Sequence, residues 1–249
     1  MTEVLLDRDG GVAVLTFNAP DRRNALTLPM AAAVVEAVET CENDESVHAI
    51  VVTGAPPAFC AGADLSALGD AQEEGLRGIY ASFLALANCG LPTIAAVNGA
   101  AVGAGLNVAL ACDMRIAGPK ARFDARFLQI GIHPGGGMTW MLQRTVSKQT
   151  AVAMTLFSHV LDAGAAVQHG LVWQVADDPV AVAVQLAAGA AGAPRDLVGT
   201  TKETLRVTSG NVDHATAVET ELRAQLASIS SAEFAERLTR LRTRITSRE

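Results

Sequence analysis

Residues 93–117, TIAAVNGAAVGAGLNVALACDMRIA, carry the pattern that decides the fold. The apolar run 93–97 predicts a buried strand, and a turn of small residues over 98–105 opens a helix that reaches about residue 112. Residues 114–117 predict a second short strand. Because parallel strands need a crossover connection, this order is typical of two parallel strands joined by a helix.

The same alternation lies on the N-terminal side of this stretch. The pattern predicts strands over 12–17 and 47–53 and helices over 28–42 and 72–88, which together favour an α/β fold with a largely parallel sheet. From Met138 onward the spacing is helical, apart from a short strand predicted over 171–175. Successive helices are expected to be separated near Val146, Asp162, Asp178, Pro194 and Asn211. The last segment, 219–244, has apolar residues at helical spacing and many charged residues.

Composition excludes several classes of protein. The 249 residues are 50% apolar and 18% charged with a net charge of -7, which predicts a folded chain without a nucleic-acid surface. The acidic first ten residues do not fit a secretory signal, and the apolar tract 180–193 is too short to span a membrane. The cysteines form no CxxC pair and have no histidine at ligand spacing, so we expect no metal site and a reducing, cytoplasmic location.

Three segments in register resemble the enoyl-CoA hydratase (crotonase) superfamily. They are 19–26 (APDRRNAL), 58–65 (AFCAGADL) and 98–105 (NGAAVGAG), and 111–113 (ACD) and 134–137 (PGGG) accompany them. The resemblance implies a crotonase-like ββα spiral core with a C-terminal helical trimerisation region. We therefore expect an acyl-CoA-binding core over 1–195 and a helical region of the same domain over 196–249, assembled as a homotrimer or a dimer of trimers.

The resemblance also implies a substrate, an acyl-CoA thioester, and a way to activate it. Coenzyme A is then part of the substrate, and no separate cofactor is expected. In the family two main-chain N–H groups form an oxyanion hole for the thioester oxygen, and here they would belong to Ala63 and Ala104. Two fixed donors, one at a helix N-terminus, stabilise the charge that develops as the carbonyl becomes an enolate.

Further binding residues follow from the same resemblance. Arg22 lies where the family places a basic residue against the CoA phosphates, although a lone surface arginine is more often simply solvated, and Arg23 is a possible substitute. The other residues implied to bind CoA or substrate are Ala25, Ala61, Gly62, Asp64, Leu65, Phe127 and Gly135.

The acid–base positions depart from the family pattern. Hydration by the family uses two glutamates, whereas alignment places Asn107 at the first position and Phe127 at the second. An amide cannot take up a proton near neutral pH, and an apolar ring would displace water. Asp124 and His133 are candidate substitutes, each with a plain alternative as a turn-capping or loop residue.

Several functions therefore stay open from the sequence. One is an enzyme of the hydratase/isomerase family that hydrates or isomerises enoyl-CoA through enolate stabilisation. Another is a non-catalytic acyl-CoA carrier or sensor, and a third is a base-independent thioester reaction such as decarboxylation. A dinucleotide-binding enzyme is disfavoured, because the full GxGxxG and the following acidic residue are missing.

Overall fold

The computed structural model describes residues 2–64, 73–210 and 212–246, with only the backbone described for 244–246. The chain divides into two compact units, Met1–Ala191 and Gly192–Glu249, which are described separately.

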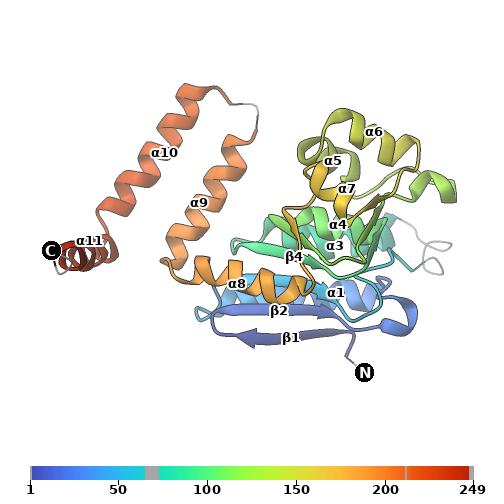
Figure 1. The fold of residues 1–249 in the computed structure, drawn as a ribbon, viewed down its shortest axis with the longest axis horizontal. Coiled ribbons are helices and arrows are strands. Elements are labelled where there is room, and N and C mark those ends of the chain that lie inside the picture. Colours follow the sequence, from blue (N-terminus) through green and yellow to red (C-terminus); the bar gives the residue numbers. More distant parts are fainter. Residues whose placement is uncertain (1, 65–72, 211, 247–249) are drawn as a thin grey trace. The chain divides into compact units, whose positions relative to one another are not determined.

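A six-stranded sheet forms the centre of the first unit (Figure 1). Its first two strands are antiparallel and the others are parallel. In spatial order the strands are β1 (Val4–Asp9), β2 (Val12–Phe17), β3 (Ala49–Gly54), β4 (Thr93–Val97), β6 (Met114–Ala117) and β9 (Gln174–Val175).

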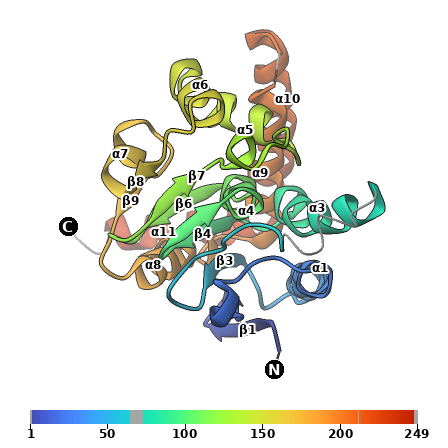
Figure 2. The same ribbon diagram turned by 90° about the vertical axis from the view of Figure 1, so that its right-hand side faces the viewer.

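Helices cover both faces of this sheet, as is usual for parallel strands. Helix α8 (Pro179–Ala191) packs on one face through Ala183 and Ala187, while α1 (Leu28–Asn43), α3 (Glu73–Asn88) and α4 (Ala104–Ala111) lie on the other (Figure 2). Every residue of β3 and β4 is buried in consequence. Their continuous apolar runs are the sequence signature of strands buried on both faces.

A second, smaller sheet runs beside the first and carries the site loops. It contains β5 (Ala100–Val102), β7 (Arg122–Asp124) and β8 (Leu161–Asp162), and single bridges join Cys60 to Ala101 and Leu26 to Ala63. Each turn of the chain thus adds residues to both sheets before its helix, as in the order β4, β5, α4. This is the ββα spiral that the family resemblance implies.

The remaining elements of the first unit follow the site loops. Two short 3₁₀ helices, η1 (Pro20–Arg22) and η2 (Phe127–Ile130), lie in the loops. Residues 134–137 form the glycine-rich turn, and α5 (Met138–Thr145), α6 (Lys148–Leu156) and α7 (Ala163–Gln168) come after it.

The second unit is helical, which confirms the helical C-terminal region expected from the sequence. It contains α9 (Arg195–Thr208), α10 (His214–Ile229) and α11 (Ala232–Thr246), and each helix contacts the next. Helix α10 begins after Asp213, whose carboxylate accepts a hydrogen bond from the Thr216 N–H. That bond holds the pKa of Asp213 below its ordinary value.

Some expected elements differ from the structure, for identifiable reasons. Strand β1 has no counterpart in the prediction, because it is an edge strand in which Asp7, Arg8 and Asp9 hide the apolar alternation. Strand β5 lies inside the stretch 98–105 that its glycines mark as a turn. The predicted strand over 171–175 shrinks to β9, and the segment 219–244 is divided between two helices.

Candidate active site

Two loops of small residues meet at the edge of the smaller sheet. Cys60 pairs with β5 through hydrogen bonds of 3.0 Å, from its N–H to Ala100 O and from Val102 N–H to its own carbonyl. Gly62 has a φ of 107°, and a Cβ there would lie 3.0 Å from Val102 O and 3.9 Å from Ala104 N. Glycine is therefore required where the loops 54–64 and 98–105 approach each other.

The two predicted oxyanion donors lie on these facing loops. The bridge to Leu26 uses Gly62 O and Asp64 N–H, at 2.7 and 2.8 Å, and leaves the Ala63 N–H outside the ladder. Ala104 is the first residue of α4, where an N–H has no carbonyl four residues back. Within the described residues, neither N–H donates to a main-chain carbonyl. Both are available to an anionic ligand atom.

Helix α4 is fixed at its far end by Arg115. The guanidinium of Arg115 donates to Cys112 O at 2.9 Å, to Leu171 O at 2.7 Å and to Ala109 O at 3.4 Å. Burial lowers the pKa of Arg115. A cation at the C-terminus complements the helix dipole, while the positive end of the dipole lies at Ala104.

Asn24 holds the loops together, and the sequence analysis did not single it out. It is fully buried with a φ of 58°, and its Oδ1 accepts from the Ala19 N–H at 2.9 Å. Its Nδ2 donates to Ala55 O and Ala58 O, both at 2.8 Å, and to Phe59 O at 3.3 Å. The tolerance of asparagine for the left-handed region was the available signal.

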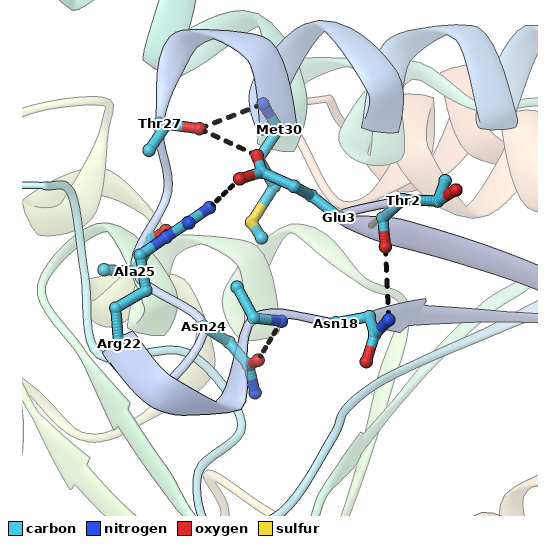
Figure 3. A network of polar contacts seen from close by, with 9 residues as sticks. Thr2, Glu3, Asn18, Arg22, Asn24, Ala25, Thr27 and Met30 are labelled. Atoms are coloured by element: carbon cyan, nitrogen blue, oxygen red, sulfur yellow. Dashed lines mark hydrogen bonds and ion pairs between the residues drawn. The ribbon is translucent and has the colours of Figure 1, made fainter.

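Arg22 is engaged with the protein itself (Figure 3). Its guanidinium contacts Glu3 at 2.5 Å, and its Nε donates to Ala25 O at 3.2 Å. The hydrogen bond from Arg22 holds the pKa of Glu3 below its ordinary value, and Thr27 adds a second donor at 3.1 Å. A contact of Arg22 with CoA phosphate stays a prediction, and it would compete with this ion pair.

Ala61, Gly62 and Asp64 lie on the loop 54–64, whereas Ala25 lies between η1 and α1, Phe127 begins η2, and Gly135 lies between η2 and α5. The Ala61 N–H donates to Arg23 O at 3.0 Å, and the Arg23 side chain is exposed. Asp64 is half-buried, and Leu65 lies outside the described residues.

Asn107 lies one turn into α4 and joins the helix to the glycine-rich turn. Its side chain is buried, and Nδ2 donates to Gly135 O at 3.0 Å. Within the described residues Oδ1 has no hydrogen-bond partner. Gly136 has a φ of 64°, and a Cβ there would lie 2.6 Å from Asn107 Nδ2 and 2.4 Å from Phe83 Cζ. The Asn107 side chain therefore holds the glycine-rich turn against α4.

Phe127 lies beside the loop 98–105. It begins η2 and is partly buried, and its Cζ is 4.0 Å from the Cβ position of Gly103, the residue before Ala104. The structure thus brings an apolar ring to the neighbourhood of the Ala104 donor.

The two candidate acid–base substitutes are both engaged with neighbours. Asp124 is 3% exposed and forms an ion pair with Arg126, whose Nε donates at 2.8 Å, while its Oδ1 has no partner within the described residues. His133 is exposed, and its Nδ1 lies 2.7 Å from Pro134 O. Asp124 is therefore a buried, charge-paired group and His133 a surface one.

Cys60 pairs with β5 beside the site loops, and its side chain is fully buried. Burial raises the pKa of Cys60 to about 12, far from that of a reactive thiolate. No cluster of three His, Cys, Asp or Glu side chains that could hold a metal ion is found among the described residues. In the same residues, no helix combines the length and apolarity needed to cross a membrane.

The fold and these loops define an α/β protein of the ββα-spiral class that presents two main-chain donors beside a helix N-terminus. A family model described as enoyl-CoA hydratase/isomerase matches residues 7–244, and the chain belongs to this family of enzymes.

Similar proteins agree with this assignment. A probable enoyl-CoA hydratase of Mycobacterium tuberculosis, EchA14, is 57% identical over 94% of this chain and 95% of its own. The 1,2-epoxyphenylacetyl-CoA isomerase of Escherichia coli is 34% identical over 85% of each chain. The crystal structure of an enoyl-CoA hydratase from Bacillus anthracis superimposes with a TM-score of 0.91, at 26% identity, over 98% of this chain and 97% of its own.

Proposed function

We propose that this protein binds an acyl-CoA thioester and stabilises its enolate with the main-chain N–H groups of Ala63 and Ala104. One observation carries the proposal: both N–H groups lie on facing loops and donate to no main-chain carbonyl within the described residues. Fixed donors at a helix N-terminus suit an oxygen that gains negative charge, and they need no reorganisation during reaction.

The reaction class follows from the family, and the residues at the site narrow it. The relatives EchA14 and 1,2-epoxyphenylacetyl-CoA isomerase are both named for reactions of CoA thioesters. Hydration with two carboxyl groups is not expected, because position 107 is an amide bonded to Gly135 O and position 127 is a phenylalanine. Since each general acid or base contributes about 10²–10⁴-fold, hydration should be slower by several orders of magnitude.

A second candidate function is an acyl-CoA carrier or sensor without turnover. The amide of Asn107 favours it, because its Nδ2 already bonds Gly135 O and its Oδ1 cannot act as a base. Decarboxylation of a malonyl-type thioester is an enzymatic reaction that would also be compatible with Asn107, since loss of CO₂ forms the enolate without a strong base.

Replacement of Ala104 by proline tests the enolate proposal. Proline is tolerated at the first helical position but lacks the N–H. We expect Ala104→Pro to lose about 10²-fold or more in turnover of whichever thioester reacts. Ala104→Ser keeps the N–H and is the matched control, expected to stay within about threefold of the wild type. The thermal transition of each variant shows whether it folds.

In this test the thioesters offered to each variant are crotonyl-CoA, a long-chain enoyl-CoA and malonyl-CoA. Binding is followed by calorimetry, and turnover is followed by absorbance or by CO₂ release. Turnover that disappears in Ala104→Pro supports the enzyme, and binding without turnover supports the carrier. If no thioester binds to the wild type, the proposal is wrong.

We also propose that the protein acts in the cytoplasm as a homotrimer or a dimer of trimers. The helices of the second unit support assembly, because in the described chain they leave large apolar side chains exposed, among them Leu205, Leu226 and Leu241. Light scattering on the purified chain gives the mass directly, and a monomer would contradict the proposal.

A further inference from the structure

Tyr80 is the single tyrosine of the chain, and its hydroxyl lies against the glycine-rich turn. It belongs to α3 and is half-buried. A Cβ built on Gly135 would lie 2.2 Å from the Tyr80 hydroxyl oxygen and 3.2 Å from its Cζ. Gly135 is not among the glycines with positive φ. Glycine at this position is therefore explained by the room that the Tyr80 hydroxyl occupies.

The surroundings of Tyr80 connect it to the proposed site. Its ring is tilted against Phe83 with 5.5 Å between centroids, and Phe83 in turn packs on Gly136. Gly135, which the hydroxyl contacts, accepts the hydrogen bond from Asn107. Asn107 is three residues after Ala104 on α4, so the two share one helix face about 4.5 Å apart along the axis.

The hydroxyl of Tyr80 has no hydrogen-bond partner among the described residues, and it is not one of the fully buried polar atoms, so it is open to solvent or to a ligand beside the glycine-rich turn. Phe83 beside it is apolar, and the Oδ1 of neighbouring Asn107 is also without a partner in the described chain. The Tyr80 hydroxyl and Asn107 Oδ1 are therefore two polar groups that have no hydrogen-bond partner within the described residues.

We propose that the Tyr80 hydroxyl hydrogen-bonds a second oxygen atom of the substrate, on the acyl chain beyond the thioester, so that the site selects oxygenated acyl-CoA thioesters. The inference rests on the proposed function, in which Ala63 and Ala104 hold the thioester oxygen. 3-Hydroxybutyryl-CoA, which carries one oxygen beyond the thioester, is a simple ligand of this kind. Tyr80 is thus a specificity-determining residue.

A substrate with a purely hydrocarbon acyl chain should bind less well. Such a chain would displace water from the Tyr80 hydroxyl without offering it a hydrogen-bond partner, and this is unfavourable. A site that donates a hydrogen bond to a substrate oxygen discriminates against the analogue that lacks this oxygen. With phenylalanine at position 80 the site should no longer discriminate between the two.

The test compares 3-hydroxybutyryl-CoA with butyryl-CoA by calorimetry on the full-length protein. We expect the wild type to favour the hydroxylated thioester by about tenfold. Tyr80→Phe should abolish the preference by weakening 3-hydroxybutyryl-CoA about tenfold while leaving butyryl-CoA within about twofold. Phe83→Leu is the packing control, because it alters the same wall without removing a hydroxyl and should affect both ligands alike.

Gly135→Ala gives an independent way to disturb the same contact. The added methyl group must displace the Tyr80 hydroxyl, so this variant should lose the same preference. Combining it with Tyr80→Phe should cause no further loss of selectivity, because both changes act on one interaction.

A spectroscopic signal separates contact from general packing. Because the chain has one tyrosine, biosynthetic 3-fluorotyrosine places a single ¹⁹F probe at position 80. The resonance should shift on adding 3-hydroxybutyryl-CoA and stay in place with CoA alone. An unchanged preference in Tyr80→Phe together with an unmoved ¹⁹F signal would overturn the role of Tyr80 and leave the thioester proposal intact. Failure of every thioester to bind the wild type would overturn both.

Discussion

The two sides of the proposed site are built from different parts of the chain. The proposed carbonyl side consists of main-chain groups from the loops 54–64 and 98–105, which Gly62 lets approach closely. The acid–base side consists of the side chains of Asn107 and Phe127, neither of which can exchange a proton near neutral pH. Main-chain donors depend on the path of the chain and on small residues. Side-chain acids depend on single positions, so they can change while the fold and the carbonyl side persist.

The largest effect is expected where the carbonyl side depends on one side chain. Asn24→Ala removes three donated bonds and one accepted bond from a fully buried position. Because the carbonyls of Ala55 and Ala58 would lose these partners, the free energy of unfolding should fall by about 3 kcal/mol or more. Denaturant titration measures it.

Asn18→Ala serves as its control, since Asn18 donates one exposed bond, to Thr2 O. We expect the control to stay within about 0.5 kcal/mol of the wild type. A loss below about 1 kcal/mol in Asn24→Ala would mean that the two loops are held by other contacts.

The acid–base side can be tested by restoring what it lacks. The double change Asn107→Glu and Phe127→Glu places carboxyl groups at both positions, and hydration of crotonyl-CoA should rise by about 10²-fold or more. Each single variant should gain less, because a water molecule needs both a base and an acid. A folded double variant that binds crotonyl-CoA without faster hydration would show that the glycine-rich turn, released from Asn107, no longer shapes the site.

A smaller effect is expected at the far end of α4. Arg115→Met keeps the apolar stem but removes the guanidinium that bonds the carbonyls of Cys112 and Leu171. The free energy of unfolding should fall by about 2 kcal/mol, while the ratio of affinities for different thioesters stays constant. Thermal unfolding and calorimetry test the two halves of this prediction, and a changed affinity ratio would show that α4 shifts along its axis when its C-terminus is released.

Local patterns predicted most of the fold. Residues 93–97 form a largely apolar run of strand length, 114–117 have the length of a short strand after a helix, and the helix over 28–42 has Pro29 at its start, so these elements follow from sequence alone. Strand β5 could not be predicted in this way, because it lies in the stretch of small residues 98–105 that indicates a turn, and its partner, β7, comes about twenty residues later.

Side-chain partners were harder to predict than elements. Asn24 bonds carbonyls more than thirty residues away, and Tyr80 meets Gly135 across two elements. Neither contact leaves a local pattern in the sequence. The family resemblance supplied the positions of Ala63 and Ala104, but it could not show that Arg22 has a partner within the chain.

The smallest effect concerns Arg22, whose guanidinium bonds Glu3 instead of standing free for phosphate. Arg22→Ala should lower the free energy of unfolding by less than about 1 kcal/mol, as for other partly exposed ion pairs. It should change the affinity for crotonyl-CoA by less than about threefold, whereas a tenfold loss would assign Arg22 to the CoA phosphates.

The pH dependence of stability gives an independent check on this pair. Because the hydrogen bond from Arg22 holds the pKa of Glu3 below its ordinary value, the Glu3 carboxylate stabilises the folded state fully at any pH above the ordinary pKa of a glutamate. The contribution is lost as the pH falls through the lowered pKa. The difference in unfolding free energy between the wild type and Glu3→Gln should therefore be constant near neutral pH and disappear in acid. A difference that persists after Glu3 is protonated would mean that the loop 19–27 is held by the shape of the side chain and not by its charge.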